Sequence, residues 1–272
     1  MKLHLLSIVL VLGIAACRRD VPITPPLPTP PTPSTLRLKD MTERNLPSPS
    51  YHFAYNDDGT IAQASIYSGL AIYNVRYSGK NISALESTIN RDTLQYEYTG
   101  SNLTVIRVKN VQGVVYRRCL ITCNAVNQLL ELEWQVKDGD IGYAVERLQQ
   151  FSYYPDGNLQ AVFFHFFAVG SQTEAMYTDT YGDYDDKVNA DGFSLLHPFQ
   201  LEHLILLPDY RLQLNNPRRQ VHTGDGTNYE VTYSYTYDAA GRPVIKNGDV
   251  LFTNGPDNGT HFQSQETFSY YD

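Results

Sequence analysis

Aromatic residues alternate with polar residues along most of the chain, and each alternating stretch is followed by a glycine-containing turn. A period of two places a row of rings on one face of an extended strand, and glycine permits the positive φ that a tight reversal needs. Each alternating stretch, together with its turn, therefore predicts a β-hairpin. The units are Tyr51–Gly59, Tyr73–Gly79, Tyr96–Gly100, Phe151–Gly157 and Tyr233–Gly241.

The pattern predicts an all-β fold, because helical periodicity is nearly absent. Within His197–Leu207 a short helix, near 198–207, could begin at Pro198 and end before Pro208. We expect strands near residues 51–56, 60–67, 71–78, 82–89, 93–98, 103–109, 113–122, 129–136, 144–154, 159–167, 172–178, 228–238, 242–252 and 261–271.

Two resemblances concern these hairpins. Tyr237–Arg242 reads Tyr-Asp-Ala-Ala-Gly-Arg and resembles the YD repeat of RHS and teneurin-like proteins, of which the other hairpins are degenerate copies. Residues 50–270 resemble an envelope lipoprotein family of unknown function, with counterparts of its motifs at Lys187–Ala190, where Ala replaces Pro, and at Asn215–Pro217. The resemblance implies a large curved antiparallel meander sheet, open or half-barrel, and no activity.

A membrane β-barrel is the weaker alternative. Outer-membrane barrels usually begin with an ordinary signal peptide and end in an aromatic residue, whereas this chain ends in Asp272. Leu129–Trp134 alternates in polarity, but Val162–Phe167 is apolar on both faces, which favours a buried central strand covered by loops or by the short helix.

The N-terminus carries the most specific motif. Lys2 precedes the apolar run Leu5–Ala16, and Ile14–Cys17 resembles the lipobox of bacterial lipoproteins. The resemblance implies a signal peptide over 1–16 and lipid attachment, including palmitate, at Cys17. A transmembrane helix is disfavoured because the run has about 12 residues and a span needs roughly 20. Arg18 is not the Asp that favours inner-membrane retention, so we expect an outer-membrane lipoprotein whose domain faces either the periplasm or the medium.

A proline-rich tether follows the anchor. Its prolines, between Pro22 and Pro33, exclude helix and sheet, and an extended polyproline chain rises about 3.1 Å per residue. We therefore divide the chain into the signal peptide 1–16, the acylated cysteine with its tether 17–36, and a single all-β domain 37–272.

Charge and cysteines limit the partners and the covalent chemistry. The formal net charge of −8 argues against nucleic acid as a partner. Apart from Cys17, the cysteines are Cys119 and Cys123, which would lie on one face of a strand about 13 Å apart. A disulfide needs about 7 Å or less, so we expect free thiols.

Catalytic and metal motifs are weak. Glu131 and Glu133 lie two apart on one face of a strand, a spacing that suits a glycosidase pair, but such residues are usually the solvated face of a strand. The histidines lack metal-ligand spacing, and no Gly-x-Ser-x-Gly or phosphate-binding loop occurs in a suitable context. We predict no catalytic residues, no metal and no cofactor. Asp92–Leu94 also looks like a three-residue O-glycosylation signal at Thr93.

Tyr177–Gly192 breaks the hairpin rhythm and holds five aspartates and three tyrosines. Rings and carboxylates on a loop suit a sugar or calcium, although the EF-hand order fails at Lys187. A merely solvated loop is the competing interpretation. The residues we select as ligand-binding are Tyr181, Tyr184, Asp183 and Asp185.

Three functions remain open. The preferred one is a non-catalytic glycan- or peptide-binding module anchored at the outer membrane, favoured by the tether and the tyrosine-rich sheet. A structural scaffold for another envelope protein is the alternative, and a hydrolase is less favoured. A ring-lined groove would support the first, an apolar patch of several hundred Å² the second, and a cleft with convergent carboxylates the third.

The lipobox generates a direct prediction. Replacing Cys17 with Ser removes the acylation site, so palmitate labelling and fractionation with outer membranes should both be lost. Unchanged labelling and fractionation of Cys17→Ser would contradict the lipoprotein assignment.

Overall fold

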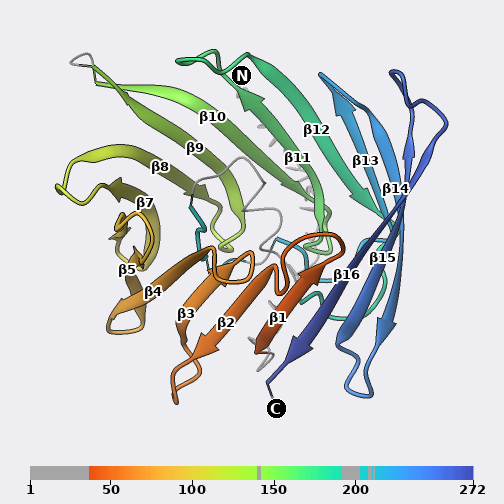
Figure 1. Ribbon diagram of the computed structural model, residues 1–272, viewed down its shortest axis with the longest axis horizontal. Helices are drawn as coiled ribbons and strands as arrows, with labels where there is room; N and C mark the ends of the chain where they lie inside the picture. Colours follow the sequence, from red (N-terminus) through yellow and green to blue (C-terminus); the bar gives the residue numbers. More distant parts are fainter. Residues whose placement is uncertain (1–36, 140–141, 191–202, 208–209, 211, 272) are drawn as a thin grey trace, which may run out of the picture.

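The chain folds into a closed barrel of sixteen antiparallel strands (Figure 1). The computed structural model describes residues 37–139, 142–190, 203–207, 210 and 212–271. Sequence neighbours pair throughout the barrel, so the topology is a simple meander. The strands are β1 Leu38–Glu43, β2 Tyr51–Tyr55, β3 Ile61–Ile66, β4 Ala71–Ser78, β5 Asn81–Ser87, β6 Thr93–Thr99, β7 Asn102–Lys109, β8 Val115–Cys123, β9 Leu129–Asp138, β10 Gly142–Tyr153, β11 Leu159–Phe166, β12 Ala175–Gly182, β13 Arg219–Gly224, β14 Tyr229–Tyr237, β15 Pro243–Phe252 and β16 His261–Tyr270.

The expected open or half-barrel sheet is wrong, because β1 closes the meander. Met41 of β1 pairs with Phe268 of β16 on one side and with Tyr51 of β2 on the other. A strand that is hydrogen-bonded on both sides leaves no edge, and closure alone removes the unpaired backbone groups of a sheet. The all-β class itself is confirmed.

Each of the fourteen expected strands overlaps one of β2–β12 or β14–β16. The sequence prediction missed β1 and β13. A register shift between Leu38 and Asp40 interrupts the alternation of β1. The six residues of β13, Arg-Gln-Val-His-Thr-Gly, include only one aliphatic side chain, at Val221.

The expected helix near 198–207 is wrong where it can be followed. Residues 198–202 lie outside the described residues, and 203–207 are not helical. Leu204, Ile205, Leu206 and Leu207 are each at most 4% exposed. The Tyr96 hydroxyl accepts a hydrogen bond from the Leu206 backbone nitrogen at 3.0 Å. The segment therefore runs inside the barrel with neighbours on every side. A surface helix would bury only the residues on one of its faces, whereas here four consecutive side chains are buried.

His203 attaches this segment to the barrel wall. Its Nε2 lies 3.1 Å from the Asp92 carboxylate and 3.0 Å from the Tyr116 hydroxyl, which itself donates to Asp92 at 2.6 Å. On the other side of the ring, Nδ1 lies 3.3 Å from the Tyr73 hydroxyl. A buried polar side chain is tolerated when it is hydrogen-bonded in this way.

The inner wall of β1–β11 is mainly apolar and packs against Leu204–Leu207, which we call the inner segment. Its most deeply buried inward side chains are large aromatic and aliphatic ones, which supply most of the stabilisation by burial. They include Met41, Phe53, Tyr73, Leu85, Leu94, Ile106, Leu132, Trp134 and Val162.

The outer face carries polar pairs across neighbouring strands. Arg107 donates to Glu97 at 2.6 Å, and Arg219 to Glu230 at 2.7 Å. Other outward pairs are Gln63 with Asn74, Arg76 with Glu86, Arg118 with Gln135, and Gln150 with Glu131. None of the described segments forms a helix long and apolar enough to cross a bilayer.

Cys119 and Cys123 both lie in β8 and are free thiols, as expected. Cys119 is buried on the inner wall, and Cys123 is half-buried. The prediction from strand geometry is confirmed.

The inside and outside of β6 should differ sharply in their contribution to stability. Leu94 is fully buried, so Leu94→Ala should lower the free energy of unfolding by about 2–5 kcal/mol. Gln95, the next residue, faces outward opposite Arg107, and Gln95→Ala should change it by roughly 0.5 kcal/mol or less. Urea denaturation measures both, and equal losses would contradict the assignment of faces.

Candidate functional site

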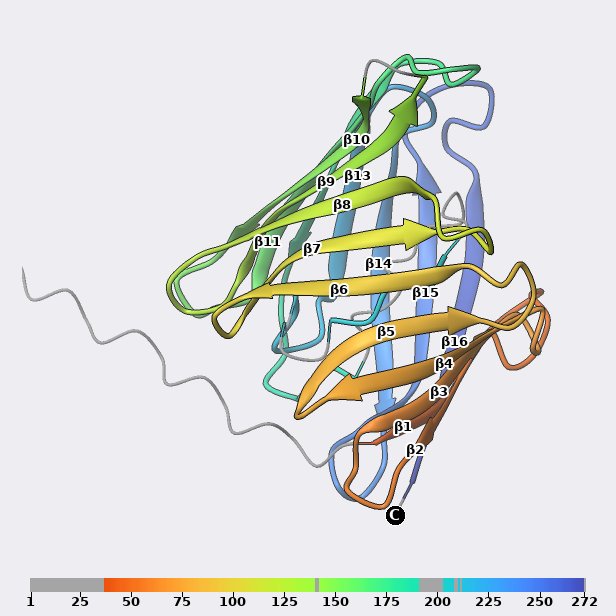
Figure 2. The same ribbon diagram turned by 90° about the vertical axis from the view of Figure 1, so that its left-hand side faces the viewer.

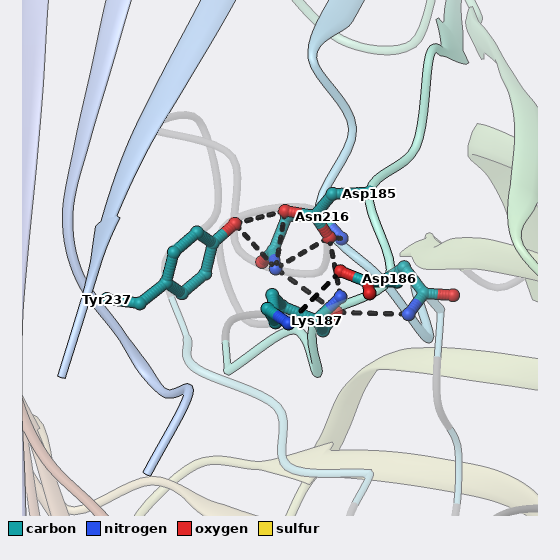
Figure 3. A network of polar contacts seen from close by, with 6 residues as sticks. Asp185, Asp186, Lys187, Asn216 and Tyr237 are labelled. Atoms are coloured by element: carbon teal, nitrogen blue, oxygen red, sulfur yellow. Dashed lines mark hydrogen bonds and ion pairs between the residues drawn. The ribbon is translucent and has the colours of Figure 1, made fainter. Parts of the chain in front are cut away.

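A network of polar contacts joins the two ends of the β12–β13 connection (Figure 3). Asp185 accepts hydrogen bonds from the Asn216 backbone at 3.2 Å, the Lys187 backbone at 3.0 Å and the Tyr237 hydroxyl. The Asn216 amide also donates to the Lys187 carbonyl, and Val188 pairs with Asn215 as an isolated antiparallel bridge. We call this network the clasp. It brings together the two segments that the family resemblance singled out.

Tyr181 and Tyr184 are not on an exposed loop. Tyr181 belongs to β12 and is 5% exposed within the core, so the expectation that it lies outside the strands is wrong. Tyr184 follows the strand, packs against the core and donates to the Leu159 carbonyl at 2.6 Å. The expected loop fails because Tyr177–Gly182 forms the second part of β12.

Asp183 and Asp185 lie just beyond β12 with different surroundings. Asp183 is exposed and has a φ of 55°, a left-handed conformation that Asp tolerates. Asp185 is held in the clasp. The ligand-binding role of these four residues stays a prediction, and Cys17 lies outside the described residues.

A different set of side chains lies at the end of the barrel that the β11–β12 and β13–β14 turns form, which is the upper end in Figure 2. The Arg147 guanidinium lies 5.3 Å from the Trp134 ring centre and 5.8 Å from that of Phe166. Tyr177 lies 4.6 Å from His222, which stacks on Tyr229 at 4.6 Å with 2° between the rings. Together these inward side chains form what we call the ring ladder: Trp134, Arg147, Phe166, Tyr177, His222, Tyr229 and Phe252.

The ring ladder and its neighbours contain several polar atoms without partners among the described residues. Arg147 and Gln149 are 3% and 0% exposed, yet Arg147 Nε and Nη2 and both amide atoms of Gln149 make no hydrogen bond. The Trp134 indole nitrogen is also unpaired. The hydroxyls of Tyr177, Tyr181 and Tyr229 have no partner within the described part of the chain. Unpaired buried groups are rare in folded proteins, so the concentration of such atoms on Trp134, Arg147 and Gln149 indicates a site.

Asp179 and His222 form the polar centre of this wall. The Asp179 carboxylate lies 2.8 Å from His222 Nδ1 and accepts from the Gln220 amide at 3.1 Å. Both Asp179 and His222 are at most 9% exposed. The pairing fixes the imidazole against the Tyr229 ring and leaves its Nε2 directed away from Asp179.

Burial changes the ionisation of the wall. Burial raises the pKa of Tyr177 to about 12, with a smaller contribution from the Asp179 charge and an opposing one from Arg147. Burial also raises the pKa of Tyr181 and Tyr229 well above the ordinary value. At neutral pH these three hydroxyls are therefore protonated and can donate hydrogen bonds.

Sequence reasoning missed this site, although a signal existed. In the fourth hairpin, Phe151 and Tyr153 form the row of aromatic rings on the inner face. The two preceding positions on the same face are polar, Gln149 and Arg147. Asp179 lies between Tyr177 and Tyr181 in the same way. Polar residues in register with a row of buried rings mark an inward site.

Other candidate chemistry is not assembled. Glu131 and Glu133 face outward on β9 and bind the amides of Gln150 and Gln135. No group of three His, Cys, Asp or Glu side chains suited to a metal occurs among the described residues. Thr93 faces outward opposite Lys109, while Asp92 is buried.

Comparisons show the fold alone. No protein-family model matches the chain, and no curated protein is significantly similar to it. A crystal structure described as a porin-like protein from Bacteroides uniformis ATCC 8492 superposes with a TM-score of 0.58 at 13% identity, covering 88% of this chain and 100% of the other. A porin-like protein from Bacteroides vulgatus ATCC 8482 gives 0.50 at 18% identity, covering 81% and 92%. The chain thus shares a β-barrel fold with porin-like proteins.

The raised tyrosine pKa values predict alkaline unfolding. In the unfolded chain these phenols ionise near pH 10, and in the barrel Tyr177 ionises near 12. Stability from the neutral rings is therefore fully present below about pH 10 and is lost as the pH rises through the folded pKa. Phenolate absorbance and near-ultraviolet circular dichroism should change together in one cooperative step. Ionisation of all tyrosines near pH 10 with the fold retained would contradict their burial.

Proposed function

We propose that this protein is a lipid-anchored envelope protein that binds a small glycan, without catalysis, in the upper part of its barrel. The observation that carries the proposal is the set of unpaired hydrogen-bonding groups beside the ring ladder. The lipobox and the proline tether support the anchor at the outer membrane.

The polar outer face supports our proposal that the barrel lies in water rather than in the bilayer. The guanidinium group of Arg118 projects outward near the middle of β8, and that of Arg107 projects outward in the second half of β7. An arginine at the centre of a lipid-facing wall costs about 2–4 kcal/mol. The acyl chains at Cys17, with the tether, would then provide the membrane attachment.

The two sides of the lumen differ, and this difference supports the upper part of the β9–β15 side as the position of the ligand. Sixteen-stranded barrels are wide enough to leave an aqueous lumen. The inner segment and the clasp fill the space against β4–β8 and at the lower end of β12–β14. At the upper end, Phe262 sits opposite Val250 on an inward position and is 50% exposed. Solvent therefore reaches the inner face of the β15–β16 hairpin at this end.

A glycan fits the chemistry of this wall better than an apolar ligand does. The three tyrosine hydroxyls, the Gln149 amide and the Arg147 guanidinium require many hydrogen-bonding partners, and a sugar presents a dense set of hydroxyls. Ring edges of Tyr177 and Tyr229 supply apolar contact beside these groups. An apolar ligand would leave the buried donors unpaired at about 1–3 kcal/mol each.

Removing two hydroxyls tests the proposal. A printed array of bacterial and plant oligosaccharides identifies the bound sugar, and calorimetry measures its affinity. Tyr177→Phe and Tyr229→Phe keep the rings but lose the donors, so each should weaken binding by about 5- to 10-fold, corresponding to about 1 kcal/mol per hydrogen bond.

Tyr271→Phe is the matched control, because its hydroxyl bonds the Phe53 carbonyl near the C-terminus, at the opposite end of the barrel. Its affinity should not change. An array without a bound sugar, or equal losses in all three variants, would refute glycan binding in the upper lumen.

A further inference from the structure

Three neighbouring side chains on β9 and β10 hold five unpaired polar atoms. Trp134 pairs directly with Arg147 across the two strands, and Gln149 lies two residues along the same inner face. All three residues are at most 3% exposed. The atoms are four donors, namely Arg147 Nε and Nη2, Trp134 Nε1 and Gln149 Nε2, and one acceptor, Gln149 Oε1.

No carboxylate of the described residues forms an ion pair or a hydrogen bond with Arg147. Glu146 is nearest in sequence, but both of its oxygens bind Arg117, at 2.7 and 3.2 Å. Asp179 binds His222 and Gln220.

Apart from Glu146 and Arg117, which pair with each other, the groups that act on Arg147 are uncharged. Burial raises the pKa of the Cys119 thiol and of the Tyr177 phenol, so both are neutral at physiological pH. Burial lowers the pKa of Arg147 to about 10, which still leaves it charged at that pH. The inner wall thus contains one buried positive charge without an ion-pair partner in the described part of the chain, and such a charge is strongly unfavourable unless something pairs with it.

The five unpaired atoms determine which chemical group would pair with them. A planar guanidinium edge matches the two oxygens of a carboxylate, and the indole and amide donors add to it. The Gln149 carbonyl requires a donor beside that carboxylate, such as a hydroxyl. A carboxylate with an adjacent hydroxyl is the chemistry of a sugar acid.

We propose that Arg147, Gln149 and Trp134 form a subsite for the carboxylate of an acidic sugar, with Arg147 as the counter-charge. The inference rests on the proposed glycan-binding function and names the class of glycan. The ring ladder leads from this subsite to the solvent-exposed rim at β15, so the remaining sugar units lie along Tyr177 and Tyr229.

Calorimetry with matched sugars tests the subsite on the full chain in detergent micelles. The probes are trigalacturonate, its methyl ester and neutral galactotriose. The native protein should bind the acid about 10- to 100-fold more tightly than the ester, as expected for a charge-assisted bidentate pair. In Arg147→Met the ratio of the two affinities should fall to near one, and Arg147→Lys should restore only part of it because the planar fork is lost.

Arg107→Met is the matched control, because Arg107 carries the same charge on the outer face, paired with Glu97. Arg107→Met should keep the native ratio of the affinities for the acid and the ester. Equal affinity for acid and ester in the native protein, or a ratio that survives Arg147→Met, would overturn the subsite. If the neutral sugar still binds in that case, the proposed function stands without the acidic specificity.

Thermal unfolding with a minimal anion separates the subsite from glycan binding. Glycolate carries a carboxylate beside a hydroxyl, and it should raise the Tm of the native protein but not of Arg147→Met, whereas ethylene glycol should raise neither. Without ligand, Arg147→Met should raise the Tm by about 2–4 °C, because an unpaired buried charge is removed. A purely structural arginine would give a lower Tm, which would overturn the proposal. A larger shift with methyl phosphate than with glycolate would reassign the subsite to phosphate.

Discussion

Closure through β1 is the constraint on which the rest of the structure depends. The strand is six residues long, and it joins β16 to β2 by backbone hydrogen bonds on both of its sides. Once the sheet is closed, the period of two in every strand divides the side chains into an inside and an outside. The rows of rings then face a common interior instead of one side of an open sheet. The aromatic alternation seen in the sequence is the signature of this interior.

The closed wall encloses more space than its own side chains fill, and the chain uses that space in two ways. On the side of β4–β8, Leu204–Leu207 packs against the apolar wall and His203 bonds Asp92 and Tyr116, while the clasp joins the two ends of the β12–β13 connection at the lower end of the barrel. On the side of β9–β15, the upper part of the wall is polar and aromatic, and several of its groups have no partner among the described residues. Stability is thus concentrated in one part of the lumen and binding chemistry in the other.

The sequence predicted strands far better than it predicted their closure. Period-2 rows ending in glycine turns identified fourteen strands, because each row records burial on one face. The bulge after Leu38 and the polar composition of Arg219–Gly224 concealed β1 and β13. Open and closed sheets differ by a single strand here, so missing β1 left the predicted sheet open. The candidate site was missed for another reason: five aspartates in Tyr177–Gly192 attracted attention, whereas Arg147 and Gln149 stand out only when register shows that they face inward.

The central claim is that the upper lumen holds a ligand on Arg147. A high-resolution crystal structure of the full chain grown with trigalacturonate tests it most directly. The account predicts a carboxylate bound in the plane of the Arg147 guanidinium, with a sugar hydroxyl donating to the Gln149 carbonyl and further units beside Tyr177 and Tyr229. An Arg147 that pairs only with ordered water or with a carboxylate of the protein itself, while the sugar is absent or bound outside the barrel, would contradict it.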